Sequence, residues 1–223
     1  MATKEKQRLR IKFSRGDEVK YISHLDLMRF WERALRRAEI PLAYSEGFSP
    51  HPRISLAAPL PVGTTSEGEL MDVFLQRRTS PYFFMREMGQ QLPSGIDISE
   101  MKEVPLRAPS LQSQLRYAEY HVEVKVDDKK PEEVQQALNA LLKAESLPWH
   151  HIRDTGVRHY DLRVLIDDIW LITWQDSQCA LGMRLRTDNR GTGRPEQVTA
   201  ALGLSHHPDR IHRTGLILAG NEH

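Results

Sequence analysis

The 223-residue chain contains one cysteine, Cys179, and no run that approaches 18 consecutive apolar residues. A single cysteine cannot form a disulfide within the chain, so the reducing cytosol is the expected compartment. It also cannot supply the thiolates that a cysteine-bound zinc site or an iron–sulfur cluster would need from this chain alone. Because the first residues lack an apolar signal-peptide core, we expect neither secretion nor a membrane-spanning segment.

Charge is distributed unevenly along the chain, although the net charge is only +1. Residues 1–60 hold twelve Lys and Arg but seven Asp and Glu, whereas residues 61–149 hold ten against fourteen. A local excess of positive charge on a nearly neutral protein indicates an anionic partner at one place rather than general polyanion binding. The proportions of hydrophobic residues (39%) and charged residues (27%) are those of an ordinary folded protein, so disorder is not expected.

The periodicity of apolar residues predicts an α+β fold made of two tandem ferredoxin-like (βαββαβ) halves with antiparallel sheets. In the first half, residues 1–105, we expect strands at 8–13, 53–57, 69–76 and 96–104 and helices at 24–39 and 81–91. Residues 106–115 are rich in Pro, Ser and Gln and are predicted to be a linker. In the second half, residues 116–223, we expect strands at 118–126, 169–174, 180–186 and 211–218 and helices at 131–145 and 195–202.

Two segments of the first half carry candidate phosphate contacts. The strand at 8–13 has apolar residues on one face and Arg8, Arg10 and Lys12 on the other, which predicts a basic open face. The helix at 24–39 follows a capping pair, Ser23 and Asp26, and turns an apolar stripe inward. Its glutamates could leave the other face an ordinary solvated surface. Alternatively, guanidinium groups on that face, three and four residues apart, can each bind a phosphate with two parallel hydrogen bonds. These groups belong to Arg29, Arg33, Arg36 and Arg37.

The segment that follows this helix, Gly47-Phe-Ser-Pro-His-Pro-Arg53, combines several residues with special properties. Gly47 permits a backbone angle or a close approach that a side chain would block. The two prolines favour extended geometry and hold His51 and Arg53 in place. An exposed Phe48 would stack on a base, whereas a buried one would belong to the core. The segment is thus a candidate nucleic-acid contact or a structural loop.

A catalytic hypothesis rests on His24 and His51. His24 stands at the positively polarised start of the helix, and together with His51 it would supply the acid and the base for metal-free RNA cleavage. The sequence Ser23-His-Leu-Asp26 does not indicate a catalytic triad, because neighbours at a helix start point in different directions and capping explains two of them. The remaining histidines lack the spacing of metal ligands, so no metal site and no cofactor is expected.

A second candidate phosphate site lies near the end of the chain, where Thr187-Asp-Asn-Arg-Gly-Thr-Gly-Arg-Pro195 precedes a predicted helix. The free N–H groups at that helix start could hold a phosphate. The segment has neither the lysine of a P-loop nor the three glycines of a dinucleotide fingerprint. It also suits an ordinary hairpin-to-helix connection. The residues that would form the site are Arg190, Gly191, Gly193 and Arg194.

The run YISHLDLMRFWERALRRAEIPLAYSEGFSPHPRISLAAPLPVGTTSEGELMDV, from Tyr21 to Val73, closely resembles the bacterial radical-SAM-linked domain family, a group of unknown function. Asp161-Leu-Arg163 and Gly193-Arg-Pro-Glu-Gln-Val198 resemble its C-terminal blocks, and the likeness covers about residues 8–218. Members of the family occur as separate chains or fused behind a radical-SAM enzyme with a cobalamin-binding-like segment. They tend to be encoded close to a ribonuclease of the E/G type and to ribosomal proteins.

The resemblance and the basic segments together favour a cytoplasmic accessory protein that binds RNA, or a ribosomal substrate containing RNA, and works with a separate radical-SAM enzyme. The chain lacks the three-cysteine motif of those enzymes, so it cannot hold their cluster and is expected to be non-catalytic. Two alternatives stay open. Tandem ferredoxin-like halves with a late glycine-containing loop resemble the metal-independent endoribonucleases that process CRISPR repeats. The chain could also be an adaptor whose arginines bind only the radical-SAM protein. No membrane partner is expected.

Overall fold

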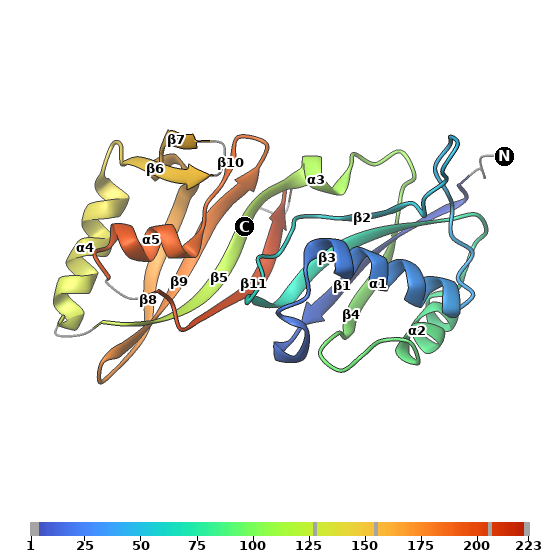
Figure 1. The fold of residues 1–223 in the computed structure, drawn as a ribbon, viewed down its shortest axis with the longest axis horizontal. Coiled ribbons are helices and arrows are strands. Elements are labelled where there is room, and N and C mark those ends of the chain that lie inside the picture. The colour runs from blue at the N-terminus through green and yellow to red at the C-terminus, as the bar shows by residue number, and fades with distance from the viewer. Residues whose placement is uncertain (1–4, 127–128, 154–155, 205–206, 221–223) are drawn as a thin grey trace. The chain divides into compact units, whose positions relative to one another are not determined.

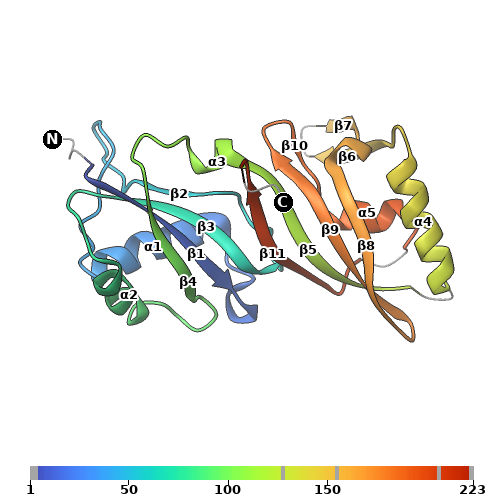
Figure 2. The ribbon, with the colours of Figure 1, turned by 180° about the vertical axis from the view of Figure 1, so that it is seen from behind.

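The computed structural model describes residues 5–126, 129–153, 156–204 and 207–220, without the side chains of residues 151–153. The chain divides into two compact units, Met1–Gln114 (unit 1) and Leu115–His223 (unit 2). Figures 1 and 2 show them from opposite sides. Both units combine helices with antiparallel strands, which confirms the α+β class predicted from the sequence. Across the described ranges, no helix has the length and apolar character that a bilayer crossing requires.

Unit 1 contains, in chain order, β1 (Gln7–Arg15), the short 3-10 helix η1 (Asp17–Val19), α1 (His24–Arg37), β2 (Ile54–Leu56), β3 (Thr65–Leu75), α2 (Pro81–Gly89), β4 (Ile98–Val104) and α3 (Leu111–Gln114). β1 lies between β3 and β4, and β2 pairs with the other edge of β3. All three pairings are antiparallel, so the order across the sheet is β4-β1-β3-β2.

Both long helices of unit 1 pack on one face of its sheet. The inward stripe of α1 includes Trp31, which is fully buried and meets Phe13 of β1 edge-on, with 5.0 Å between the ring centroids. Phe84 and Met88 of α2 belong to the same apolar cluster. Ser23 caps α1 by accepting a hydrogen bond from the Asp26 N–H, as the sequence predicts. The outer face of α1 is therefore left to its arginines.

Unit 2 contains β5 (Leu115–Lys125), α4 (Pro131–Lys143), β6 (Pro148–Arg153), β7 (Gly156–Asp161), the 3-10 helix η2 (Arg163–Leu165), β8 (Ile166–Gln175), β9 (Gln178–Asp188), β10 (Gly191–Thr192), α5 (Pro195–Ala201) and β11 (Arg210–Leu218). β5 lies between β9 and β11, and β8 pairs with the other edge of β9. The order across this sheet is β11-β5-β9-β8. Of these four strands, the first in the chain (β5) lies between the last (β11) and the third (β9), as β1 lies between β4 and β3 in unit 1.

The core of unit 2 also lies on one face of its sheet, where α4 and α5 contribute Val134, Leu138 and Val198 to the apolar cluster. β6 and β7 form a separate two-stranded sheet between α4 and β8. Neither this hairpin nor α3, which lies within the expected linker, is predicted from the sequence. The hairpin has a functional consequence because β7 forms one wall of a pocket.

Candidate nucleic-acid interface

The basic open face predicted for β1 is wrong for Arg8 and Arg10. Both side chains are buried and share one carboxylate, that of Asp72 on β3, which is itself fully buried. The Nε and Nη2 of Arg10 lie 2.8 and 3.0 Å from the two carboxylate oxygens. Arg8 donates to the same carboxylate and to the carbonyl oxygens of Ala108 and Pro109. Arg10 is therefore committed inside the fold and is not available to a phosphate.

Two further candidate cations have acidic neighbours. The ammonium of Lys12 is half-exposed and lies 3.6 Å from a Glu100 carboxylate oxygen, an ordinary surface ion pair. Arg53 contacts the carboxylate of Glu5, and its guanidinium lies 4.7 Å from the centre of the Phe74 ring. A phosphate at either position would compete with an internal partner.

The outer surface of α1 keeps the character that the sequence predicts. Arg33, Arg36 and Arg37 are exposed, and no described carboxylate lies within 4 Å of any of them. The side chain of Arg29 is 68% exposed, with its guanidinium 3.4 Å from Asp26. Positions 29, 33 and 36 follow the spacing that places side chains on one side of a helix. We refer to these four arginines as the α1 arginine face.

The loop that follows α1, residues 44–52, presents an aromatic ring to solvent. Its neck is braced because the Ser45 N–H donates to the His51 carbonyl at 2.9 Å and the His51 N–H donates to Ser45 Oγ at 3.0 Å. Gly47 adopts a φ of 124°, which strains any other residue. Phe48 is fully exposed, at 106% of its reference area. The core alternative for Phe48 is therefore excluded.

His24 and His51 do not meet. His24 is the first residue of α1. Two residues before it, the Ile22 carbonyl accepts a hydrogen bond from the side chain of Arg15, the last residue of β1. His24 therefore lies near the end of β1. His51 lies beyond the other end of α1, where Arg53 and Ala43 are bonded to Phe74 near the first residues of β1. The 14 residues of α1 put roughly 20 Å between these ends. A single acid–base pair of His24 and His51 is therefore ruled out.

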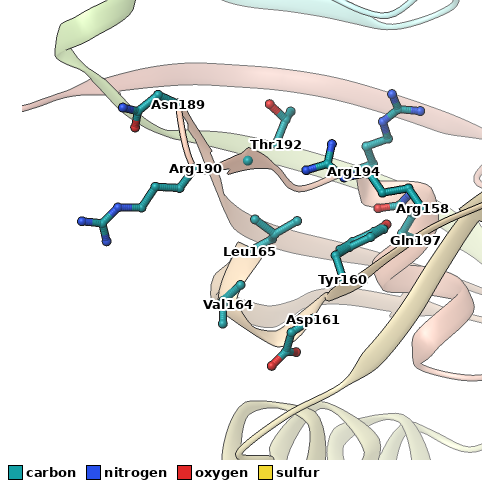
Figure 3. A pocket seen from close by; sticks show the side chains of 11 residues that line it. Arg158, Tyr160, Asp161, Val164, Leu165, Asn189, Arg190, Thr192, Arg194 and Gln197 are labelled. Carbon is teal, nitrogen blue, oxygen red and sulfur yellow. The ribbon is translucent and has the colours of Figure 1, made fainter.

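The late glycine-containing segment forms part of a pocket within unit 2, shown in Figure 3. The cavity measures about 350 Å³ and is lined by residues of β7, η2, the turn between β9 and β10, and the start of α5. Arg158 and Arg194 lie on the same side of it, next to Tyr160 and Gln197, whereas Arg190 extends away on the opposite side. The pocket is thus lined by two arginines that the sequence predicts as candidates, Arg190 and Arg194, and by a third, Arg158, that it does not predict.

The two glycines of this segment serve packing in the structure. A Cβ on Gly193 would lie 2.8 Å from the Leu165 carbonyl oxygen and 3.0 Å from the Leu185 Cβ. A Cβ on Gly191 would lie 2.7 Å from Leu165 Cδ2. Both glycines therefore let the segment lie directly on η2, and this contact sets the position of Arg194. The predicted cradle of free N–H groups is not needed to explain them.

Asp161 fastens the hairpin that carries Arg158. Its Oδ1 accepts hydrogen bonds from the N–H groups of Leu147 (2.8 Å) and Arg163 (2.9 Å). Arg163 in turn donates to the carbonyl oxygens of Leu142 and Ile166. The N–H of Leu147, followed by that of Arg163, lowers the pKa of Asp161 from its ordinary value of 3.8, because both favour the ionised form.

This geometry predicts an acid-sensitive contribution to stability. Because the pKa of Asp161 is lower in the folded chain, its bonds stabilise the fold above about pH 4 and lose that effect as pH falls through the folded value. We expect Asp161→Asn to flatten the decrease of the urea midpoint between about pH 4 and 3. Asp176→Asn, at an exposed turn position that already has positive φ, is the control. Equal acid profiles for wild type and Asp161→Asn would contradict the prediction.

Other candidate chemistry is weak. Burial raises the pKa of the Cys179 thiol to about 11, so it stays protonated and packs as a small apolar group. Within the residues that the structure describes, no group of three or more His, Cys, Asp or Glu is placed to hold a metal ion.

The fold and the site together define an α+β protein of two antiparallel units, one with an exposed arginine face and the other with an arginine-lined pocket. The chain belongs to a family described as an uncharacterized protein conserved in bacteria (DUF2344), whose model matches residues 8–195. No curated protein matches the sequence.

Among solved structures, the chain is similar to one in a Cbf5-Nop10-Gar1 complex, with a TM-score of 0.50 and 10% identity over 94% of this chain and 48% of that one. A structure of an H/ACA RNP bound to a substrate RNA containing 2'-deoxyuridine gives a TM-score of 0.46 at 10% identity, over 93% and 46%. The archaeal box H/ACA sRNP Nop10-Cbf5 complex gives 0.45 at 9%, over 93% and 46%. The chain spans about half the length of these chains, and at this identity the likeness concerns the fold.

Proposed function

We propose that the protein binds RNA through unit 1 and acts as a non-catalytic, cytoplasmic accessory to a separate radical-SAM enzyme. The observation that carries RNA binding is the fully exposed Phe48 on a braced loop, at the end of unit 1 where α1 finishes with Arg36 and Arg37. Residues 38–43 connect that helix end to the loop (Figure 1). An exposed aromatic ring and guanidinium groups without a described carboxylate partner, both present in unit 1, are the two kinds of contact that single-stranded nucleic acid uses.

Both kinds of group gain free energy from a nucleic-acid partner. A large aromatic side chain left in water contributes nothing to the core, but stacking on a base contributes about 1–3 kcal/mol. Guanidinium groups fork onto phosphate oxygens with two parallel hydrogen bonds. The α1 arginine face offers them with little competition, because only Arg29 has a described carboxylate neighbour. Arg10 has no part in this surface.

The partnership with a radical-SAM enzyme is supported by the sequence resemblance, which is strongest in the segment that forms α1 and the loop. The repeated strand order of the two units supports the interpretation of each as a ferredoxin-like half, divided near residues 106–115. RNA, or an RNA-containing ribosomal substrate, is then held by this chain for chemistry that the partner performs.

Salt-dependent binding of a single-stranded RNA oligomer tests the proposal. Each phosphate contact contributes about 0.7 to the slope of log affinity against log salt concentration, so Arg33→Gln/Arg36→Gln should reduce that slope by about 1.4. Phe48→Ala should weaken binding roughly tenfold or more at every salt concentration without changing the slope. The slope and affinity would be measured by fluorescence anisotropy between 50 and 300 mM salt (on the order of the physiological range).

The matched control is Lys102→Gln/Arg107→Gln, which removes the same charge from exposed positions of unit 1 outside α1. Lys102 lies opposite Arg10 in the sheet register and therefore points away from the helices. An equal loss of slope in the control, or no RNA binding by the wild type, would refute the proposal. A complex with the radical-SAM protein that survives nuclease treatment, without any RNA binding, would indicate the adaptor alternative.

A further inference from the structure

The pocket of unit 2 has chemistry that the proposed RNA surface on α1 does not use. Its lining comes from two separated segments, within residues 158–165 and residues 189–197. Asp161 accepts a hydrogen bond from the N–H of Arg163, and Gly193 packs closely on Leu165. Each contact holds one of the two segments in place. We propose that this pocket binds one ribonucleotide, with its phosphate held between Arg158 and Arg194. The proposal goes beyond RNA binding by α1 and does not depend on it.

The size of the cavity sets the class of ligand. About 350 Å³ lies at the lower end of the range for small-molecule sites, roughly 300–1,000 Å³. This accommodates a single nucleotide but not an extended strand. The walls come from a strand, a 3-10 helix and a helix start that are fixed by hydrogen bonds, so the pocket is present before the ligand arrives.

The charges in the pocket favour a phosphate. Arg158 and Arg194 both line the cavity and lie on its right in Figure 3, and no described carboxylate lies within 4 Å of either guanidinium. The one carboxylate in the lining, Asp161, accepts hydrogen bonds from two N–H groups and lies below the other labelled side chains in Figure 3. Two guanidinium groups on one side of a cavity can each present a pair of donors to phosphate oxygens. Arg190, which also lines the pocket and extends away from it in Figure 3, adds further positive charge nearby.

The uncharged lining suits the rest of a nucleotide. Tyr160 presents an aromatic ring beside the two arginines, and a base can stack on such a ring. Asn189 and Gln197 bring amide groups, which carry both donors and acceptors and can bond to the edge of a base or to ribose hydroxyls. Leu165 adds apolar surface to the same lining. Phosphate, sugar and base therefore each have a partner of the right kind.

The proposal is tested by isothermal titration calorimetry of the full chain. The ligands are the nucleotides AMP, CMP, GMP and UMP, the four corresponding nucleosides, and inorganic phosphate. At least one nucleotide should bind measurably, and at least about tenfold more tightly than its nucleoside or phosphate alone, because both sets of contacts are needed. Arg158→Gln and Arg194→Gln should each weaken that binding by about tenfold. Lys143→Gln, at the exposed end of α4, removes the same charge outside the lining and should leave the affinity unchanged.

A second pair of ligands, a short RNA with and without a 5'-phosphate, shows whether the pocket binds the end of an RNA or a free nucleotide. Tighter binding of the phosphorylated RNA that is lost in Arg158→Gln assigns the pocket to an RNA end, whereas binding of mononucleotides alone assigns it to a free nucleotide. The inference is overturned if no nucleotide binds at millimolar concentration, or if Lys143→Gln weakens binding as much as the pocket variants. Arg33→Gln/Arg36→Gln should change only the salt slope for long RNA, so failure at α1 is distinguishable from failure at the pocket.

Discussion

Asp72→Ala should destabilise the protein by about 3–5 kcal/mol, the cost expected when one partner of a buried ionic group is removed. Asp72 is fully buried, and its carboxylate is the shared acceptor for Arg8 and Arg10. Without it, two guanidinium groups that are less than a tenth exposed would be left with uncompensated charge. The free energy of unfolding, measured with urea, gives the effect directly. The loss should be accompanied by unfolding of unit 1, whose central strands the cluster joins.

Glu100→Gln is the matched control, because Glu100 also faces a cation of β1 but its side chain is 70% exposed. A surface pair of this kind contributes about 0–1 kcal/mol, so the control should be nearly neutral. A loss below about 1 kcal/mol in Asp72→Ala would show that water replaces the carboxylate, and that Arg8 and Arg10 are less buried in solution than in the structure.

Gly193→Ala should destabilise unit 2 by about 1–3 kcal/mol, the usual cost of an added methyl group in a packed site. The new Cβ would meet the Leu165 carbonyl oxygen at 2.8 Å, and a main-chain atom cannot swing aside as a flexible side-chain end can. The segment would be pushed off η2 together with Arg194. Thermal unfolding followed by circular dichroism would measure the effect.

Gly215→Ala provides the comparison, because a Cβ there meets no atom within 4 Å. It should leave the melting temperature within a few degrees of the wild type. Nucleotide affinity gives a second readout, since displacement of Arg194 should weaken binding in Gly193→Ala but not in Gly215→Ala. Equal melting temperatures for the two variants would contradict the packing role assigned to Gly193.

The sequence predicts most regular elements of the fold because their periodicity is strong. α1 is the clearest case, with its Ser23 cap, its buried stripe through Trp31 and the spacing of its arginines all readable from residue types. The boundaries of β5 and β9 differ from the predicted ones by only a few residues, since apolar and polar residues alternate regularly along both strands. Local pattern was sufficient wherever one face of an element is buried.

The fate of Arg10 could not be read from the same pattern. Alternation places Arg10 and Asp72 on the polar faces of their strands, but only the register of β1 against β3 makes them direct neighbours. Register depends on contacts that are distant in sequence, and a polar face is exposed or covered according to those contacts. An acidic residue on the polar side of a neighbouring predicted strand was the available signal that a basic face could be neutralised internally.

The pocket was half predicted for a related reason. Arg190 and Arg194 stood out because glycine and proline surround them, whereas Arg158 and Tyr160 belong to a segment with little hydrophobic contrast. The β6–β7 hairpin has mostly exposed described side chains, so its alternation carries no apolar signal. Gly156, which adopts a φ of 122° at the start of β7, was the one residue that could have indicated a hairpin there.

The bonds from Arg8 to Ala108 and Pro109 bear on where the chain can be cut. A truncated polypeptide that ended at Val104, the last residue of β4, would lack both carbonyl acceptors. The buried guanidinium of Arg8 would then keep only its bonds to Asp72. It would also lose Leu111, which is fully buried, and the amide of Gln112 that bonds to Ser55. An autonomous amino-terminal fragment should therefore retain every residue up to Gln114, and limited proteolysis should spare the stretch that composition alone would mark as dispensable.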